Sequence, residues 1–265
     1  MNCINLTKLR FSLLFTKSAQ QSQFIGNTLR GSLGSALAKT HPNIYQKIFK
    51  TDAEESIPNP FVISAPYPNK REYQRGDELH FHVTLFGVAC AFEEEIIDAA
   101  TAMSSGKLLN TRLVECEQIY NRKWSDEGAD SILYCDRLTI NFLTPTEIFV
   151  KKEITTQIDF SLFIDRLFAR ISAIIDNYGE SEFIIPYNLI TKKPFVEAKS
   201  DLRRVIFQTN NQPINGILGK VEYFGDITRY LPYIDLGSQM HIGKKTTRSC
   251  GEYVFEIQGG RSDDL

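Results

Sequence analysis

Apolar and polar positions repeat with two different periods along the chain. Residues 79–86 (LHFHVTLF) alternate with a period of two, which is typical of a β-strand with one buried face. Residues 159–178 place apolar side chains at helical spacing and stop before Gly179, which predicts a long amphipathic helix. The order in which the two patterns recur predicts the fold class.

Both halves of the chain are expected to follow the order β-α-β-β-α-β. In the first half, the expected strands are residues 9–17, 60–66, 79–86 and 113–124, and the expected helices are residues 27–41, 44–49 and 93–108. In the second half, the expected strands are residues 137–144, 205–208, 218–223 and 253–257, and the expected helices are residues 159–178 and 228–236. This order predicts an α+β fold of tandem ferredoxin-like, or RRM-like, domains.

A polar break at residues 126–130 (DEGAD) is the expected boundary between the two domains. We therefore expect an N-terminal ferredoxin-like domain at residues 1–130 and a C-terminal one at residues 131–258. Residues 259–265 are expected to form a tail or linker. A chain of 265 residues is long enough for two domains that each bury a hydrophobic core.

The composition is that of a globular protein without an overall basic charge. Hydrophobic residues make up 42% of the chain, charged residues 23%, and the net charge is −2. A nucleic-acid surface would therefore have to be a local patch. The basic groups that could form one are Lys244-Lys245-Arg248, Arg203-Arg204, Lys192-Lys193 and Lys151-Lys152, although each alone is also typical of a solvated face.

The cysteine and histidine positions predict no metal site. The five cysteines are scattered without a C-x-x-C spacing, which indicates reduced thiols and a cytoplasmic protein. His80 and His82 share one face of an expected strand, and we expect that face to be exposed rather than metal-binding. No apolar run reaches transmembrane length, so no membrane partner is expected.

The candidate chemistry lies near the end of the chain, in residues 241–251, which we call the glycine-basic loop. It follows a helical pattern that is expected to end at Gly237, and it leads into the last expected strand. A loop with Gly243, Gly251 and three cations can bring backbone N–H groups and positive charge to a phosphate. The alternative is a solvated basic turn that only joins a helix to a strand.

Two motifs resemble the CRISPR repeat-RNA-processing endoribonucleases of the RAMP superfamily. The C-terminal motif consists of Gly237, His241, Gly243, Lys244, Thr246, Thr247, Gly251 and Tyr253. The motif that resembles the family's first helix consists of Phe24, Gly26, Leu29, Arg30, Gly31, Leu33, Gly34, Ala36 and Leu37. The chain has Ser249-Cys250-Gly251 where the family usually has glycine-x-glycine, which puts the loop conformation in question because serine reaches positive φ less readily than glycine.

The resemblance implies a reaction that needs neither a metal nor another cofactor. In this family the RNA 2′-hydroxyl attacks the adjacent phosphate and leaves a 2′,3′-cyclic phosphate and a 5′-hydroxyl. Such a reaction needs a general base, a general acid and a cation for the developing charge. No P-loop, dinucleotide fingerprint, H-E-x-x-H or paired-carboxylate spacing indicates another chemistry.

The resemblance places the catalytic histidine in or just after the first helix, and His41 is the histidine in that region. We expect His41 to act as base or acid, Tyr45 to assist it, and Lys47 or Lys50 to stabilise the phosphate. The alternative is that His41 only caps a surface turn. In some relatives the histidine falls closer to Phe49, and under that alignment the chain has no catalytic histidine.

The resemblance also implies an RNA surface and a set of partners. Its expected residues are Arg30, His241, Gly243, Lys244, Lys245 and Arg248, with Arg30 either on a phosphate or paired with a carboxylate. The expected partner is CRISPR repeat RNA, together with an effector ribonucleoprotein complex or CRISPR integration proteins. Two further alternatives are an inactive RAMP-type subunit that holds repeat RNA and an adaptor domain linked to integration machinery.

Overall fold

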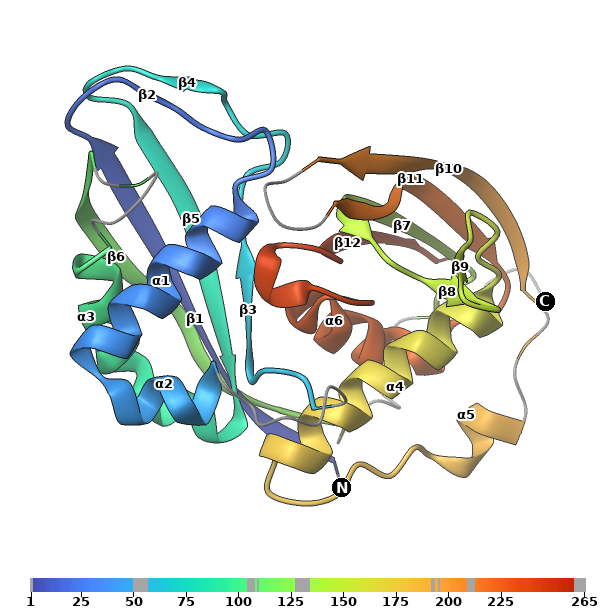
Figure 1. The fold of residues 1–265 in the computed structure, drawn as a ribbon. Helices are drawn as coiled ribbons and strands as arrows, with labels where there is room; N and C mark the ends of the chain where they lie inside the picture. Colours follow the sequence, from blue (N-terminus) through green and yellow to red (C-terminus); the bar gives the residue numbers. More distant parts are fainter. Residues whose placement is uncertain are drawn as a thin grey trace.

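The fold contains two four-stranded antiparallel sheets with the same strand order (Figure 1). The first sheet has the order β3 (Phe61–Ser64), β5 (Glu78–Phe86), β1 (Cys3–Phe15) and β6 (Thr111–Ser125). The second has the order β10 (Glu197–Phe207), β11 (Ile214–Phe224), β7 (Arg137–Thr146) and β12 (Tyr253–Gln258). Each sheet therefore has the strand order second, third, first, fourth. This order confirms the predicted pair of ferredoxin-like units.

The computed structural model describes residues 2–49, 57–103, 108, 110–126, 134–191, 194, 196–208 and 213–259. The helices of the first unit are α1 (Gly26–Thr40), α2 (Pro42–Ile48), the 3-10 segment η1 (Gly87–Phe92) and α3 (Glu93–Thr101). Those of the second unit are α4 (Phe160–Tyr178), α5 (Tyr187–Thr191), η4 (Thr228–Tyr230), α6 (Leu231–Met240) and η5 (Thr246–Arg248). Two short ladders, β2 (Ala19–Gln20) with β4 (Glu72–Tyr73) and β8 (Phe149–Val150) with β9 (Glu153–Ile154), complete the fold.

Helices α1 and α3 cover one face of the first sheet, because apolar side chains at every second position of its central strand β1 point to that face. In β1, Leu9, Phe11 and Leu13 point to this face and are fully buried. The stripe of α1 that includes Leu29 and Leu33 packs into the same core.

Helix α4 has the same role in the second unit. Its N-cap Asp159 accepts a hydrogen bond from the backbone N–H of Leu162 at 2.7 Å, and the helix ends before Gly179. The bounds therefore confirm the predicted helix. The apolar stripe of α4 packs with β7, β11 and α6 in one core.

The two units share a core across their junction. Ile4 and Leu6, on the opposite face of β1, belong to the same buried cluster as the apolar residues of α4 and α6. Trp124 of β6 meets Tyr233 of α6 edge to face at 5.8 Å between ring centroids. The helix layer of the second unit therefore packs against the first sheet, which fixes how the two halves sit together.

Helix α6 differs from the sequence prediction because it does not end at Gly237. It continues to Met240, with Gly237 buried inside it. A Cβ at this position would lie 2.0 Å from Leu167 Cδ1 and 2.6 Å from the Tyr253 hydroxyl oxygen. The glycine therefore permits close packing rather than ending the helix.

Several other element bounds also differ from the prediction. Strands β10 and β11 are much longer than residues 205–208 and 218–223, and β7 continues through Pro145. Helix α3 ends at Thr101, well before residue 108. The expected domain boundary between residues 130 and 131 lies outside the described residues, as does the tail after Gly259. None of the described helices has the length and hydrophobicity that crossing a bilayer requires.

Candidate nucleic-acid interface

The glycine-basic loop follows an irregular path that depends on left-handed backbone conformations. His241, Gly243, Lys245, Ser249 and Gly251 have φ values of 56°, 82°, 60°, 64° and 78°. A Cβ on Gly251 would lie 1.9 Å from a backbone oxygen, so this position requires glycine. Ser249 does adopt the positive φ at the place where the related motif has glycine. Such strain persists only where surrounding contacts determine the conformation.

The first of these contacts is a buried histidine. His241 is 2% exposed, and its Nδ1–H donates to the Cys250 carbonyl oxygen at 3.1 Å, while Nε2 accepts from Ser64 Oγ at 3.0 Å. Burial lowers the pKa of His241 to about 3, so the ring is neutral. Because both nitrogens have partners and the ring is buried, the RNA contact predicted for His241 is not available in this structure. Its role here is to hold the loop.

Two further side chains hold the loop from the second unit. Arg170 of α4 is buried and donates to the Met240 carbonyl oxygen at 3.2 Å and to Thr246 Oγ1 at 3.0 Å. Burial lowers the pKa of Arg170 to about 10, which leaves it charged at neutral pH beneath the loop. Lys245 forms an ion pair with Glu147, which is 5% exposed. The predicted phosphate contact of Lys245 is therefore in competition with a buried carboxylate.

Helix α1 docks on the other side of the loop. The backbone at Gly26 touches the carbonyl of Arg248, since a Cβ there would lie 2.1 Å from that oxygen. Arg30 Nε donates to Thr247 Oγ1 at 3.1 Å. Burial, followed by the nearby charge of Arg248, lowers the pKa of Arg30. The carboxylate partner that the sequence allowed for Arg30 does not occur within the described chain.

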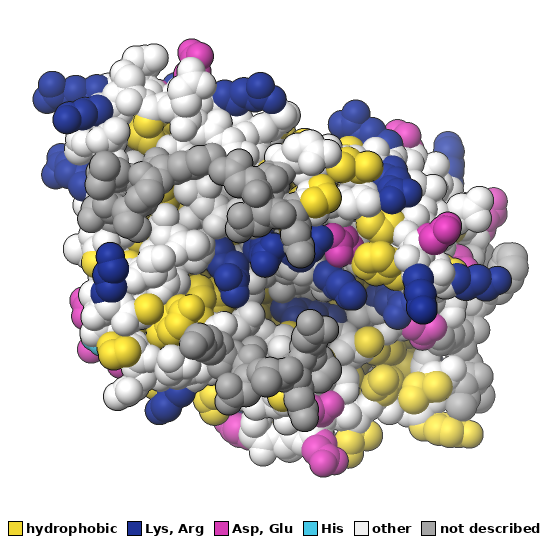
Figure 2. All heavy atoms as spheres, in the orientation of Figure 1, with side chains coloured by type: hydrophobic (Ala, Val, Ile, Leu, Met, Phe, Trp, Pro, Cys, Tyr) yellow, Lys and Arg dark blue, Asp and Glu magenta, His cyan; other side chains and the backbone are white. Residues whose placement is uncertain are grey.

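Three cations in this region, which we call the junction cations, are Arg30 and Arg248, which lie near each other, and Lys244 of the same loop as Arg248. Neither Arg30, Lys244 nor Arg248 forms an ion pair with any carboxylate of the described residues. Among the described residues, the backbone N–H groups of Gly243, Lys244 and Lys245 have no backbone oxygen as acceptor. Figure 2 shows Lys and Arg side chains gathered along the depression between the two halves. Cations and backbone donors at one place form a site for a phosphate.

The predicted catalytic histidine lies at the other end of α1. His41 joins α1 to α2, and its Nε2 lies 3.2 Å from Asp98 Oδ2 of α3. Along the helix axis, His41 is about 16 Å beyond Arg30 at 1.5 Å per residue. Its neighbour α3 begins with three glutamates. The structure therefore separates His41 from the glycine-basic loop and places it beside acidic side chains.

The three residues predicted to assist His41 lie along α2 or beyond it. Tyr45 stacks on Phe49, with 5.6 Å between the ring centroids, and it lies near enough to Arg30 for an electrostatic interaction. Lys47 Nζ lies 5.4 Å from the ring centroid of Phe92, on the side of α3. Lys50 lies outside the described residues, as does the pair Lys192-Lys193. Tyr45 is thus the member of the predicted catalytic group that approaches the junction cations.

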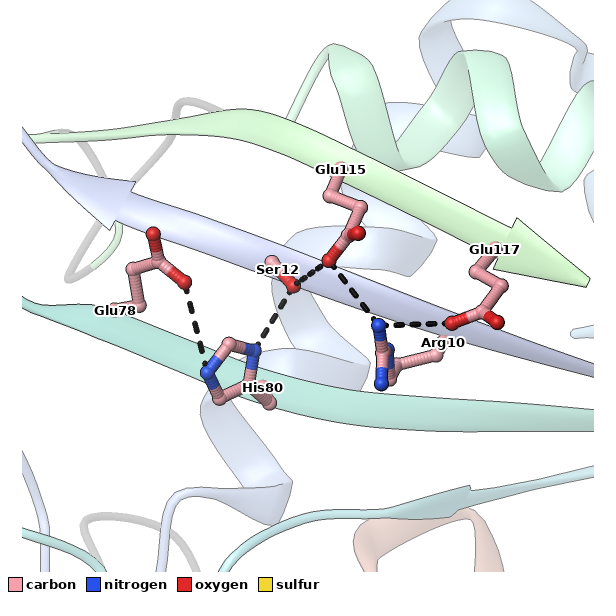
Figure 3. A network of polar contacts seen from close by, with 6 residues as sticks. All are labelled: Arg10, Ser12, Glu78, His80, Glu115 and Glu117. Carbon is pink, nitrogen blue, oxygen red and sulfur yellow. Dashed lines mark hydrogen bonds and ion pairs between the residues drawn. The ribbon is translucent and has the colours of Figure 1, made fainter. Parts of the chain in front are cut away.

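The opposite face of the first sheet, beyond the part that packs against the second unit, carries a separate polar network (Figure 3). Its members are Arg10, Ser12, Glu78, His80, Glu115 and Glu117. His80 Nδ1 lies 2.9 Å from Ser12 Oγ, which in turn donates to Glu115. The prediction that this face is exposed is confirmed for His80, whereas His82 is half-buried and its pKa is lowered to about 4 by burial and by Lys8. The network's three glutamates make it unsuitable for RNA phosphates.

The sequence did not indicate the aromatic contact that closes the junction. The contact is formed by Phe24, which precedes α1, by Tyr67, which follows β3, and by Phe207 at the end of β10. Their ring centroids lie 5.5–6.2 Å apart. Arg203 is close enough to lower the pKa of Tyr67 against the larger effect of burial. These residues are far apart in the sequence, so no local pattern could have grouped them.

Two family models match the chain, one in each half. Residues 4–138 match AF_1859_N, an N-terminal domain, and residues 140–253 match the CRISPR-associated endoribonuclease Cas6. The C-terminal half of the chain is similar to the Cas6 family. The Cas6 match ends at Tyr253, so it includes the glycine-basic loop, Arg170 and Glu147. This similarity points to the endoribonucleases of CRISPR RNA processing.

Solved Cas6 structures share the fold over nearly the whole chain. A Cas6 product complex has a TM-score of 0.66 and 15% identity, and the match covers 95% of this chain and 100% of that one. Thermus thermophilus Cas6 has a TM-score of 0.64 and 16% identity, with 95% and 98% covered. A chain of a partial Cas6-RT-Cas1–Cas2 complex has a TM-score of 0.69 and 12% identity, with 96% and 46% covered. No curated protein sequence matches the chain.

Proposed function

We propose that the chain cleaves CRISPR precursor RNA within the repeat, in the cytoplasm and without a metal ion. The 2′-hydroxyl of the RNA attacks the adjacent phosphate, the bond to the 5′-oxygen breaks, and the products are a 2′,3′-cyclic phosphate and a 5′-hydroxyl. The similarity to the Cas6 family supplies the reaction class. The observation that carries the proposal is the contact of Arg30 with the glycine-basic loop, close to Arg248, at the junction of the two units.

The junction cations bind the RNA backbone in this proposal. Arg30, Lys244 and Arg248 are bound to no carboxylate of the described chain, so their charge is available to phosphates. Gly243 lets the loop pack closely against the Glu147 backbone, because a Cβ there would lie 2.5 Å from the Glu147 carbonyl oxygen. Arg170 adds a buried positive charge beneath the same loop. Phosphates that develop extra charge during cleavage are stabilised most by such fixed, partly desolvated cations.

His41 is the proposed general base. Asp98 accepts the Nε2 proton, which leaves Nδ1 with no partner in the described chain and able to take the proton of a 2′-hydroxyl. Tyr45 assists from the next turn, and Lys47 or Lys50 stabilises the phosphate. His41 lies at the far end of the helix that carries Arg30. The bond that is cut is therefore a few nucleotides from the phosphates held at the loop.

One observation favours a second function, in which the chain holds repeat RNA without cutting it. The separation of His41 from the junction cations, and its contact with Asp98, argue against a phosphate at His41 and therefore against proton transfer there. A third function follows from the Cas6-RT-Cas1–Cas2 neighbour, whose chain is more than twice as long as the part this chain matches. On that similarity, the chain would join repeat RNA to integration proteins.

Cleavage of the cognate repeat RNA in EDTA separates these functions. We expect the wild type to cut and His41→Ala to lose about 10²–10⁴-fold in single-turnover rate. His80→Ala is the matched control, because His80 is exposed and belongs to the separate polar network of the first sheet. Binding without cutting by the wild type would support the RNA-holding function instead. An unchanged rate in His41→Ala would remove His41 from the mechanism.

A further inference from the structure

The hairpin of β8 and β9 presents two lysines in an unusual backbone conformation. Lys151 and Lys152 are the two turn residues, both are exposed, and their φ values are 49° and 68°. Two-residue turns with positive φ at both positions normally contain Asn-Gly. The backbone conformation of the turn does not favour lysine at either position, so the two lysines indicate a function of their side chains.

The base of this hairpin is attached to the glycine-basic loop. Lys244 Nζ lies 5.2 Å from the ring centroid of Phe149, the first residue of β8. Arg166 of α4 donates to the Phe149 carbonyl oxygen at 2.6 Å. Glu147, two residues before β8, forms the ion pair with Lys245. The hairpin is therefore joined to the loop at its base rather than being a separate surface turn.

A row of cations continues from the junction to this turn. It comprises Arg30, Arg248, Lys244, Arg166, Lys151 and Lys152. None of the six forms an ion pair with a carboxylate in the part of the chain that the structure describes. Figure 2 shows Lys and Arg side chains running from the central depression across the C-terminal half. In Figure 1 the β8–β9 hairpin lies on that side of the molecule.

We propose that the Lys151-Lys152 turn is a second phosphate-binding point, which holds the RNA backbone beyond the nucleotides bound at the junction. This inference rests on the proposed RNA-binding function. A ligand with regularly repeated negative charges matches a row of unpaired cations better than a single small anion does. Lysines bind phosphates as point charges and read no bases, so the contact is independent of RNA sequence.

The test replaces the turn with its favoured residues. K151N/K152G removes both charges and installs the Asn-Gly pair that this turn type prefers, so the hairpin keeps its shape. The control is K199Q/K220Q, which removes the same charge from exposed lysines of β10 and β11 near Glu222. Affinity for the labelled repeat RNA is measured between 50 and 200 mM salt. We expect K151N/K152G to lower the slope of log affinity against log salt by about 1.4–1.8, and the control to leave it unchanged.

A second arm uses the same RNA shortened from each end in steps. Below one length, wild type and K151N/K152G should bind equally, because the RNA no longer reaches the turn. An unchanged slope in K151N/K152G, or an equal loss in the control, would overturn the inference. Failure of the wild type to bind either repeat RNA or random RNA of equal length would also overturn it and would favour an acidic protein partner. Binding without cleavage would contradict only the proposed nuclease, since every readout here is binding.

Discussion

The imidazole Nε2 of His241 lies 3.0 Å from the hydroxyl oxygen of Ser64, a residue 177 positions earlier in the chain. Ser64 ends β3 of the first sheet, and His241 follows the last helix of the second unit. Ala65, which follows Ser64, donates its backbone N–H to Ser249 Oγ at 2.9 Å. The edge of one unit therefore fixes both ends of the glycine-basic loop of the other. A binding loop held in this way is ordered before its ligand arrives.

Replacing His241 with alanine should destabilise the whole chain. The substitution leaves a cavity and removes the partners of the Ser64 hydroxyl and the Cys250 carbonyl, which are buried. We expect the free energy of unfolding to fall by about 2–4 kcal/mol. His80→Ala, on an exposed surface, should cost about 0.5 kcal/mol or less. Urea denaturation of both variants measures the difference, and equal small losses would show that the loop is not held by His241.

The same histidine should make stability depend on pH. In the folded chain the pKa of His241 is lowered to about 3, whereas in the unfolded chain it is near 6.5. Below pH 6.5 the unfolded state therefore binds a proton that the folded state refuses, so the free energy of unfolding falls as the pH falls towards about 3. The slope should be about 1.4 kcal/mol per pH unit for this one proton.

His241→Gln isolates this effect. The variant should lose stability less steeply than the wild type between pH 6.5 and 4, because one proton-binding group is gone. His82, whose pKa is lowered to about 4, contributes with the same sign in both proteins and cancels in the comparison. Urea midpoints at pH 7, 6 and 5 give the two slopes. Parallel slopes would mean that His241 is protonated in the folded chain.

The fold could be predicted because its determinants are local. The alternation around Phe81 and the helical stripe of α4 each report burial within one element, and the order of elements limits the topology. Element ends were less predictable. Gly237 has the sequence signature of a helix stop, but contact with Leu167 explains it instead. That contact depends on how α6 packs on α4, which no local pattern encodes.

The candidate site could be predicted only in part for the same reason. The glycines and cations of the loop are adjacent in sequence, so Gly243, Lys244 and Arg248 could be grouped before the structure was known. Arg170 carries no such signal, because its charge is buried by a fold that brings it beneath Thr246. His41 is the opposite case. The family resemblance suggested His41 as the catalytic histidine, but α1 extends away from the loop and places His41 beside Asp98.

Two glycines of α1 provide a matched pair for testing the docking of this helix. A Cβ at Gly26 would lie 2.1 Å from the Arg248 carbonyl oxygen and 2.7 Å from Ser249 Cβ, so Gly26→Ala must displace the loop. We expect it to lower the free energy of unfolding by about 1–3 kcal/mol. A Cβ at Gly31 meets nothing within 4 Å, so Gly31→Ala should raise stability by up to about 1 kcal/mol.

RNA binding should separate the same two variants. Gly26→Ala should weaken the affinity for repeat RNA, because it moves the carbonyl and side chain of Arg248 relative to Arg30. Gly31→Ala should bind like the wild type. Denaturation curves and a binding titration on the same protein samples test both statements. Equal behaviour of the two variants would show that the contact between α1 and the loop is not tight in solution.

Arg30 offers the most direct test of the junction as a phosphate site. Its guanidinium is partly desolvated, lies near Arg248 and has no carboxylate partner among the described residues, so its charge is not compensated within the chain. Arg30→Ala should therefore weaken RNA binding about tenfold and lower the salt slope by about 0.7–0.9. Lys39→Ala, in the exposed last turn of the same helix, should change neither quantity. The weakening should be uniform across RNA sequences, because phosphate contacts position RNA without reading its bases. A loss confined to the cognate repeat would instead mean that Arg30 reads a base.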